Sequence, residues 1–568
     1  MANNLQEPRQ LGLNASFFFG GLAGLLAHAI WPDSSTYWQQ HAGAYALAFV
    51  AGTSTTRGLV LLNRDIWLQR SLLKNEAPGT DHGSAREATE DELEMRGCFN
   101  PSSGNFLGFK YGRAVYSPPD APFGLYEAPP GAGKDIYFCV GDILHRSMLG
   151  QSVFVPDVKT ELAPMLAEGL TQHGVEVWSI NPSRQFEDIC GSVELGLYQA
   201  LLDAVYGDEN GLKDAVGIAQ QIAMLHLPED KGEGSKKYFS AGSRRALSIP
   251  PLVYALVDPA RCNPTATFEI LNDPEKFIRF LKTVQSDLEP EGDNSQLIKH
   301  IRSEAGNLLS RAETNPENFG SFLEWATQSI LPYNSAGHLA DYGARADRNI
   351  RDLCERPITT FVMTPHSHLA DFESFTSLVN ANLLSAIKRN PRKQKLHLCC
   401  NEFLNYRFAD IASDLEVIRG FGVTANFYIQ SFNGLVRKIG KEAAASVNDY
   451  CDVKVFAGLN SERAKHVSEM LSETTIARKD YSYRTDDPSH LNISDKRLGR
   501  RLMTADEVQA MPRDRAWVFI KGLRPVQVQL AHYGHVDPWS DLVGNNPLEG
   551  NPLKGKTMLK INYKKNGK

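Results

Sequence analysis

The sequence has little that would mark a secreted or metal-stapled protein. Its eight cysteines form no CxxC pair and no cluster spaced with histidines, and several lie inside apolar runs. This pattern is typical of buried free thiols in a reducing compartment and gives a zinc site almost no support. A positive surplus is also lacking, since the formal net charge is −6. Any contact with nucleic acid would therefore have to be local, as in a lined channel.

The composition otherwise describes an ordinary globular protein. The chain has 568 residues, of which 42% are hydrophobic and 22% charged. At ~150 residues per domain, this length predicts about three to four domains.

The N-terminal region breaks this pattern. Leu11 to Trp31 contains no charged residue and reaches the length of about 20 residues that a bilayer crossing requires. A second apolar stretch extends from about Trp38 to Arg57, and basic residues follow it. The positive-inside bias then predicts two transmembrane spans with both termini in the cytoplasm. A buried helical hairpin in a soluble core is the alternative.

The stretch GLYEAPPGAGKD, residues 124–135, has the features of a phosphate-binding loop. An apolar run leads into a Pro/Gly turn, and the helix-compatible segment IYFCVGDIL follows. Glycines let backbone N–H groups close on a phosphate chain, the lysine supplies a point charge, and the helix start favours an anion. The predicted nucleotide-binding residues are Pro130, Gly131, Ala132, Gly133, Lys134 and Asp135.

Two positions depart from the usual form of such a loop. Ala128 stands where the first glycine is expected, and Asp135 stands where Ser or Thr normally holds Mg²⁺. Taken alone, the stretch could therefore also be a Gly-rich turn between a strand and a helix that binds no ligand.

The rest of the chain alternates short β-branched or aromatic runs with helical stretches. A hairpin is expected within residues 106–117, and continuous apolar strands separated by helices predict a parallel sheet covered on both faces. Between Asn181 and Thr359 the strand pattern stops and helical spacing replaces it. The sequence thus predicts an all-α domain inserted into an α/β domain.

A second nucleotide signal lies at the end of the predicted strand KLHLCCNE. In P-loop ATPases such a strand end normally carries an Asp for Mg²⁺ and a Glu that activates water. Here Asn401 takes the Asp position and Glu402 the catalytic one. Gln430, at the end of ANFYIQS, is placed to sense a γ-phosphate. Each could singly be a helix-start carboxylate or a strand-end amide.

Because of these motifs, the chain resembles the type IV secretion and conjugation coupling proteins, the TraG-like branch of the FtsK/HerA-type P-loop ATPases. The resemblance covers nearly the whole chain, and its most specific part runs from Asn401 to Leu435, NEFLNYRFADIASDLEVIRGFGVTANFYIQSFNGL. It implies a RecA-like P-loop domain with an inserted all-α domain and a two-helix transmembrane anchor. The expected boundaries are 1–75 for the anchor (spans near 11–31 and 38–57), 76–194 and 345–540 for the nucleotide-binding domain, 195–344 for the inserted substrate-facing domain, and 541–568 for a basic tail.

The resemblance also implies a function. It implies a homo-hexameric, multi-pass ATPase of the bacterial inner membrane, largely cytoplasmic, that uses ATP and Mg²⁺. Such a motor recruits a relaxase–DNA complex or a protein substrate, with contact to single-stranded DNA as an option, and passes it to a type IV secretion channel. Arg419 falls at the family's arginine finger, which reaches a neighbouring subunit's nucleotide. A helix-end ion pair is the alternative for Arg419.

Four further features of the sequence allow more than one interpretation. Asp157, Lys159 and Glu161 match the family's DxKxE element and either meet the nucleotide or cap the next helix. The cluster SKKYFSAGSRR reads more readily as a charged helical face than as a substrate contact. His366 and His368 have ligand-like spacing, but a polar loop after a strand explains them better. The lysine-rich end resembles the many tails that are disordered and solvated.

The altered metal positions lead to a hypothesis. We expect Asp135 to supply the charge that Asn401 lacks, so that the two residues organise one Mg²⁺ directly or through water. A nucleotide-gated docking receptor with little or no hydrolysis is the main alternative to a translocation motor. A chromosome-partitioning DNA pump is a third reading, but its best-known members carry four membrane spans and a winged-helix DNA reader, and neither pattern is visible.

Overall fold

The computed structural model describes residues 46, 48–53, 55–56, 81–102, 104–207, 209–229, 234–290, 292–344, 346–389, 393–403, 411–483 and 491–563. The chain forms two compact units. One comprises Arg86–Met470 and Thr504–Lys568, and the other Met1–Ala85 and Leu471–Met503.

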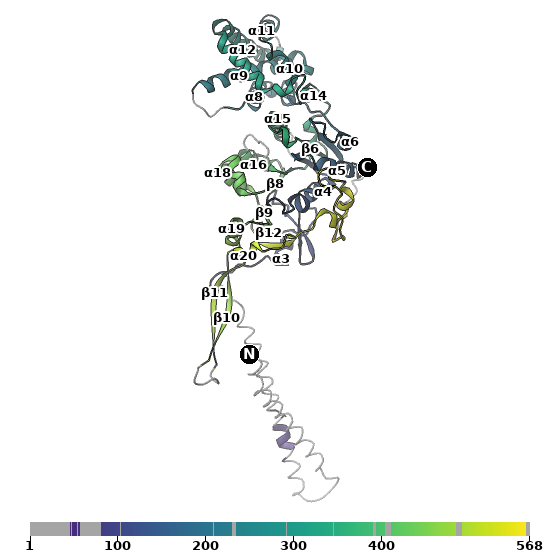
Figure 1. Ribbon diagram of the computed structural model, residues 1–568, viewed down its shortest axis with the longest axis vertical. Coiled ribbons are helices and arrows are strands. Elements are labelled where there is room, and N and C mark those ends of the chain that lie inside the picture. The colour runs from purple at the N-terminus through teal and green to yellow at the C-terminus, as the bar shows by residue number, and fades with distance from the viewer. Residues whose placement is uncertain are drawn as a thin grey trace. The chain divides into compact units, whose positions relative to one another are not determined.

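The larger unit is built on one sheet of eleven strands, in the order β2-β1-β13-β12-β9-β3-β8-β7-β4-β6-β5 (Figure 1). The strands from β9 to β5 in this order run parallel, as the continuous apolar runs predict. Their bounds are β1 Phe106–Lys110, β2 Arg113–Tyr116, β3 Phe123–Glu127, β4 Ser152–Asp157, β5 Glu176–Ile180, β6 Ile358–Met363, β7 Leu396–Cys400, β8 Thr424–Ile429, β9 Val453–Ala457, β12 Arg515–Ile520 and β13 Val526–Gln529.

One edge of the sheet is antiparallel. The hairpin expected within residues 106–117 is confirmed as β1 and β2, whereas β12 and β13 do not join the parallel part of the sheet. Strands β12, β13, β1 and β2 are each antiparallel to their neighbours. Short connections explain this edge, because β1 and β2, like β12 and β13, follow one another without the helical crossover that a parallel pair needs.

Helices cover both faces of the sheet because its strands bury side chains on both sides. On β4, Phe154 packs into one hydrophobic cluster, whereas Val153 and Val155 pack into the other. This alternation is the two-residue period of a strand. The helices outside the β5–β6 connection, short ones included, are α3 Glu90–Met95, η2 Asp135–Cys139, α4 Val140–Met148, α5 Leu162–Gln172, η7 His366–His368, α15 Glu373–Arg389, α16 Ile411–Gly420, α17 Phe432–Ile439, α18 Lys441–Tyr450, α19 Ser461–Leu471, α20 Ala505–Gln509, η9 Tyr533–His535 and α21 Trp539–Leu542.

A run of helices connects β5 to β6, as predicted from the helical spacing there. Among the described residues this connection contains no strand. Its longest helix, α9, packs against α8 and α13. The elements are α6 Glu187–Cys190, α7 Gln199–Val205, α8 Glu209–His226, α9 Ser235–Val257, η3 Pro259–Arg261, α10 Pro264–Leu271, α11 Pro274–Asp287, η4 Gly292–Asn294, α12 Ser295–Thr314, α13 Pro316–Ser329, η5 Leu331–Tyr333, α14 Ala340–Ala344 and η6 Ile350–Cys354.

The smaller unit contains a long β-hairpin that the sequence patterns did not predict. Its strands, β10 Glu473–Tyr483 and β11 Leu491–Arg501, pair antiparallel from Glu473↔Arg501 to Tyr483↔Leu491. A single bridge joins Ser84 to Thr474 at its base.

The predicted membrane spans, residues 11–31 and 38–57, lie outside the described residues except for residues 46, 48–53 and 55–56, which are helical. Within the described part of the chain, no helix has the length and apolar character to cross a bilayer.

Candidate nucleotide-binding site

Four neighbouring parallel strands bring the predicted site residues to one edge of the sheet. The strands β3, β8, β7 and β4 lie side by side in this order. Because their carboxyl ends share an edge, the loops that follow them meet there. Lys134 follows β3, Gln430 follows β8, Asn401 and Glu402 follow β7, and the DxKxE element ends β4.

The loop after β3 has the backbone conformation expected of a phosphate-binding loop. Gly131 and Gly133 have φ angles of 79° and 75°, in the left-handed region that glycine adopts without strain. A Cβ atom on Gly133 would also lie 2.7 Å from the ring of Tyr137. The chain then enters one π-helical turn, η2, which continues into α4.

Lys134 is the centre of the site. Its Nζ atom donates hydrogen bonds to Oδ1 of Asp135 at 3.0 Å and to Oδ1 of Asn401, and lies 3.2 Å from Oε1 of Glu402. Burial opposes the charged form, but the carboxylates of Asp135 and Glu402 outweigh it and raise the pKa of Lys134. The lysine is therefore held as a buried cation.

The side chains that follow β7 and β8, those of Asn401, Glu402 and Gln430, also meet in the site. Asn401 and Glu402 are both buried, and Nε2 of Gln430 donates to Oε2 of Glu402 at 3.2 Å. Glu402 has a φ of 49°, unusual for a residue with a side chain, and its N–H donates to Oδ1 of Asn401 at 2.9 Å. Such backbone strain gathers where a side chain must be aimed precisely by its surroundings.

A second lysine enters the site from the loop after β4. Nζ of Lys159 lies 3.2 Å from Asp135, 3.4 Å from Glu161 and 3.5 Å from Glu402. Burial works against ionisation of Asp135, yet Lys134 and Lys159 together lower the pKa of this carboxyl. The sequence had left the role of Lys159 open, and the structure places its ammonium among the carboxylates.

Asp157 supports the loop that carries Lys159. Its carboxylate accepts hydrogen bonds from the backbone N–H groups of Glu161 at 3.2 Å and Ala163 at 3.0 Å. Burial raises the pKa of Asp157 to about 7, and the two backbone bonds only partly counter it. Within the DxKxE element, Asp157 therefore serves the start of α5, whereas Lys159 and Glu161 face the site.

A cavity of about 380 Å³ is lined by Lys134, Asp135, Lys159, Glu161, Glu402 and Gln430. Asn401 is buried beside it and contacts Lys134. Part of its wall comes from the C-terminal segment, where Nδ2 of Asn546 donates to Oε2 of Glu161 at 3.0 Å. The lining residues from this segment are Tyr533, Asn546, Glu549, Asn551 and Leu553.

Up to Tyr563, the lysine-rich segment after Glu549 is mostly exposed, as expected of a solvated tail, but it is anchored by contacts. Strand β15, Leu559–Lys560, pairs with β14, Val536–Asp537, and the Tyr563 hydroxyl lies 2.8 Å from Nδ1 of His145. No local sequence motif indicated that the C-terminal segment forms part of the cavity wall, because this depends on contacts with residues far away along the chain. The lysine count, which suggested the tail, says nothing about those contacts.

Arg419 is not brought to this cavity. It lies near the end of α16, 3.1 Å from Oδ2 of the buried Asp452, with its side chain 40% exposed. Within one chain it therefore forms the helix-end ion pair that was the alternative reading. Its proposed role in a neighbouring subunit stays a prediction.

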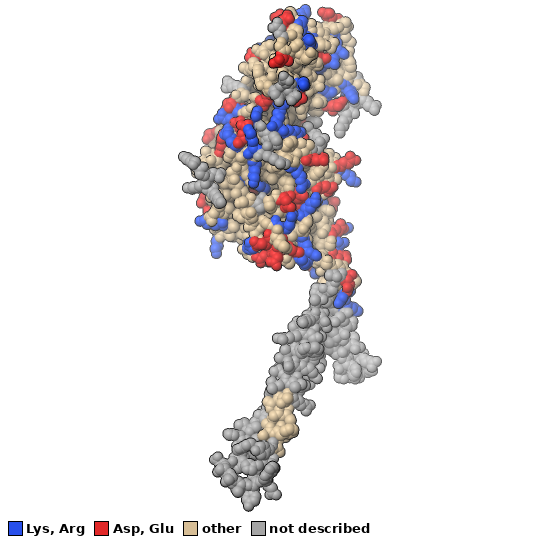
Figure 2. Space-filling model, turned by 180° about the vertical axis from the view of Figure 1, so that it is seen from behind, with Lys and Arg blue, Asp and Glu red and all other residues tan. Residues whose placement is uncertain are grey.

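The basic–aromatic cluster SKKYFSAGSRR lies at the start of α9 and is partly paired. Arg245 lies 2.7 Å from Glu304, and the Tyr238 hydroxyl accepts a hydrogen bond from Arg311 at 3.0 Å. On the face drawn in Figure 2, basic and acidic side chains are interspersed, which agrees with the modest net charge. This placement fits the charged helical face.

The residues at the cavity fit a nucleoside triphosphate with Mg²⁺. A glycine cradle, a buried lysine and carboxylate and amide oxygens are the groups that hold a phosphate chain and a hard cation. Asp135 and Asn401 both contact the Lys134 ammonium, so their oxygens face a common point.

Comparison with known proteins assigns the family. Residues 80–544 match the family described as type IV secretory system conjugative DNA transfer, and the chain belongs to this family. Protein VirD4 of Rhizobium radiobacter is 22% identical over 468 residues, which are 80% of this chain and 64% of that protein. Protein VirD4 of Agrobacterium fabrum is 22% identical over 467 residues, 80% of this chain and 66% of that protein. The chain thus spans just under two thirds of the length of these relatives.

Solved structures share the fold. The bacterial conjugative coupling protein TrwBdeltaN70, in an unbound form, superposes with a TM-score of 0.53 at 16% identity, over 79% of this chain and 92% of that chain. The plasmid coupling protein TrwB in complex with a non-hydrolysable ATP analogue gives a TM-score of 0.52 at 15% identity, over 79% and 93%. The expected RecA-like α/β fold is confirmed.

Proposed function

We propose that this protein is the coupling ATPase of a type IV secretion or conjugation system at the bacterial inner membrane. It would recruit a relaxase–DNA complex or a protein substrate and drive it toward the transfer channel with ATP hydrolysis. The observation that carries the proposal is that Lys134, Asp135, Glu402 and Gln430 line one cavity, with the buried Asn401 hydrogen-bonded to Lys134. The VirD4 and TrwB likenesses support the type of system.

Each side chain has a role that follows from its position. The backbone from Pro130 to Gly133 and the Lys134 ammonium would hold the phosphates, while Asp135 and Asn401 would hold Mg²⁺. When bound, Mg²⁺ offsets charge on the phosphate oxygens. The Glu402 carboxylate would accept a proton from the attacking water, and its orientation is fixed by the hydrogen bond from Gln430.

The active form in this proposal is a homo-hexamer anchored in the lipid bilayer by the two N-terminal spans. Arg419 then completes the site of a neighbouring subunit. Three features support this role: the residue is absent from the lining of its own cavity, its side chain is 40% exposed, and it is an arginine within the family's EVIRGFG segment. A guanidinium supplied in this way stabilises the charge of the transition state.

One observation favours the alternative, a nucleotide-binding docking receptor with little hydrolysis. Lys134 and Lys159 both contact Oε1 of Glu402, at 3.2 and 3.5 Å. An oxygen engaged by two ammonium groups has fewer positions left to accept a proton from water. Hydrolysis would then require that at least one lysine moves away from Glu402.

The test is the ATP hydrolysis rate of the full chain in mild detergent, over a range of protein concentrations, with and without single-stranded DNA. We expect the rate to rise steeply with concentration and with DNA. Lys134→Ala and Arg419→Ala should each remove it, with a loss of about 10³-fold for the arginine if it acts in trans. Arg437→Ala changes an exposed arginine at the end of α17 and is the matched control.

Mixing the two inactive variants isolates the action in trans. A chain with Arg419→Ala retains its phosphate-binding loop, and a chain with Lys134→Ala retains its arginine. Partial activity in the mixture supports a shared site. Absence of turnover in the wild type above the Lys134→Ala background, together with measurable nucleotide binding, favours the docking receptor.

A further inference from the structure

A cluster of two histidines and a carboxylate lies away from the nucleotide cavity. Its members are His338, His368 and Asp371, whose ligand atoms all lie within 4.8 Å of one another. The two imidazole rings have centroids 4.6 Å apart, and Nδ1 of His368 lies 3.5 Å from Oδ2 of Asp371. Sequence spacing did not indicate this cluster, because His338 is far from the other two along the chain.

The cluster joins two separate parts of the chain. His338 belongs to the helical connection between β5 and β6, in the loop between η5 and α14. His368 ends η7 and Asp371 follows it, both after β6. An ion held by all three residues would therefore fasten the helical connection to the carboxyl end of the sheet.

Backbone hydrogen bonds hold both loops in place. On one side, Gly337 N–H donates to Asn334 at 2.8 Å and Leu339 N–H donates to Pro332 at 3.0 Å. On the other, His368 N–H donates to Pro365 at 3.0 Å, and Phe372 N–H donates to the carbonyl of His368 at 3.1 Å. The side chains therefore project from fixed backbone positions, although each of the three is at least partly exposed.

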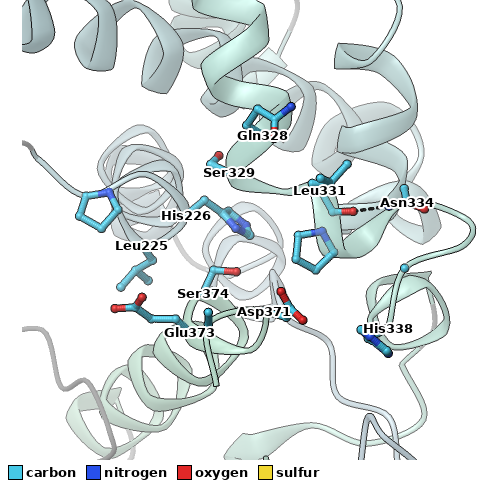
Figure 3. Close-up of a pocket in the computed structure, with 14 residues that line it drawn as sticks. Leu225, His226, Gln328, Ser329, Leu331, Asn334, His338, Asp371, Glu373 and Ser374 are labelled. Carbon is cyan, nitrogen blue, oxygen red and sulfur yellow. Dashed lines mark hydrogen bonds between the residues drawn. The ribbon is translucent and has the colours of Figure 1, made fainter. Parts of the chain in front are cut away.

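The cluster borders a cavity of about 460 Å³, which His338 and Asp371 help to line. Figure 3 shows Asp371 near Ser374 and Glu373 of α15, while His338 comes from a separate segment. A cation between these residues would thus have an open side toward a space that water can fill.

The ligand set has the chemistry of a zinc-class site. Zinc binds imidazole nitrogens and carboxylate oxygens, and three protein ligands with one water form a common four-coordinate arrangement. Donor atoms around tetrahedral zinc lie about 3.4 Å apart, so a limit of 4.8 Å requires only modest side-chain rotation. An ordinary surface ion pair would explain His368 and Asp371 but gives no reason for the second imidazole.

A second histidine pair shows what this cluster adds. The rings of His532 and His535 have centroids 3.7 Å apart, closer than those of the cluster. Among the described residues, however, the group of His338, His368 and Asp371 alone brings three such ligands together. The pair at His532 is therefore a matched site without the carboxylate.

We propose that His338, His368 and Asp371 bind one divalent transition-metal ion of the zinc class, which fastens the β5–β6 helices to the end of β6 and leaves a coordination position open to the cavity. This site is independent of the nucleotide cavity and of the proposed ATPase activity.

The test is Co²⁺ binding to the full chain in mild detergent, followed by displacement with Zn²⁺. We expect one equivalent of Co²⁺ with the intense visible absorption of a four-coordinate ion, lost on addition of Zn²⁺. His338→Ala and Asp371→Asn should each weaken binding at least about tenfold, since even outer-shell changes reach that range. Zn²⁺ should also raise the thermal midpoint of the wild type more than that of either variant.

His366→Ala and His535→Ala are the controls, because they remove neighbouring or paired histidines outside the cluster. Both should retain the Co²⁺ band and its affinity. Matching circular dichroism spectra in EDTA would show that the variants remain folded. The proposal is overturned if the wild type binds no stoichiometric Co²⁺, or if the band and its affinity survive both His338→Ala and Asp371→Asn.

Discussion

Two clusters of buried charge lie along the same helical segment, and their surroundings differ. At its start, Lys134 and Asp135 face a cavity together with Lys159 and Glu402. Seven residues after Asp135, Asp142 is enclosed by protein: its Oδ2 atom accepts hydrogen bonds from His397 at 2.9 Å and from Asn426 and Tyr428 at 2.7 Å.

This difference predicts which charged residues serve ligand binding and which serve the stability of the fold. Charges at the cavity can exchange protein partners for water or a ligand, so their loss should impair function more than stability. The partners of Asp142 have no such replacement. Burial opposes its ionisation, but His397 and Arg146 outweigh this and hold the pKa of Asp142 below its ordinary value.

The largest change in stability is expected from Asp142→Ala. It leaves His397, Asn426 and Tyr428 with buried donors and no acceptor, and should lower the free energy of unfolding by about 3 to 5 kcal/mol. Urea unfolding followed by tryptophan fluorescence measures this. Glu275→Ala, which removes an exposed partner of Arg279, is the control and should leave the midpoint nearly unchanged. A loss as small as the control's would place Asp142 in the same class as the cavity charges.

Lys134→Ala should impair ATP hydrolysis strongly and stability only slightly, in contrast to Asp142→Ala. We expect kcat for ATP hydrolysis to fall by about 10²- to 10³-fold, as when one preorganised donor to a developing charge is removed. The free energy of unfolding should change by about 1 kcal/mol or less, because Lys159 still contacts Asp135 and Glu402. Hydrolysis and urea unfolding are measured on one preparation. If Lys134→Ala were as destabilising as Asp142→Ala, the lysine would be mainly structural.

Asp157 lies between the two classes, since it is buried but supports a loop of the site. Its native pKa of about 7 exceeds the ordinary value of 3.8, so the native state keeps its proton to higher pH than the unfolded state. The stabilisation is thus complete below about pH 4 and is lost as the pH rises through about 7. Between pH 5 and pH 7, the wild type should lose about 2 to 3 kcal/mol relative to Asp157→Asn.

Comparing the wild type with Asp157→Asn cancels the contributions of other titrating groups to the pH dependence of stability. His145 and His226, whose pKa values burial lowers to about 4 and about 3, act in both proteins and cancel in the difference. Asp120→Asn, at a side chain 61% exposed, is the control and should follow the wild type at each pH. A flat difference between wild type and Asp157→Asn would mean that Asp157 is ionised in the native protein at pH 5.

Sequence reasoning located the cavity residues that follow parallel strands. Lys134, Glu402 and Gln430 each follow a strand with an apolar run, and the carboxyl ends of such strands share an edge. The family pattern then supplied the order in which these residues meet.

The remaining features depend on long-range contacts that no local pattern records. The cavity wall at Asn546 exists because this side chain reaches Glu161, and the antiparallel edge exists because β1 pairs with β13. The hairpin from Glu473 to Arg501 carries a mostly polar sequence, so hydrophobic alternation did not indicate it. Asp142 stood inside an apolar helix, where its partners on β7 and β8 could not be foreseen.

The smallest expected effect is the recovery of hydrolysis by a second substitution at the two altered metal positions. Asp135 and Asn401 both contact the Lys134 ammonium, which supports the hypothesis that Asp135 supplies the charge that Asn401 lacks. Asp135→Ser alone should abolish ATP hydrolysis, because it removes the one carboxylate of the pair. Adding Asn401→Asp restores a carboxylate beside Lys134. The hydrolysis rate of the double variant should exceed that of Asp135→Ser by about tenfold or more, which corresponds to about 1.4 kcal/mol of activation free energy.

The Mg²⁺ concentration that gives the half-maximal rate, measured together with kcat, distinguishes weaker metal binding from a general loss of activity. It should rise in Asp135→Ser and return toward the wild-type value in the double variant, whereas Asn401→Asp alone should tighten it because it adds a second carboxylate. A double variant no better than Asp135→Ser would show that the two residues do not share one ion. Asp135 would then act through its ion pairs with Lys134 and Lys159, and the cavity charges would depend on one another as closely as those around Asp142.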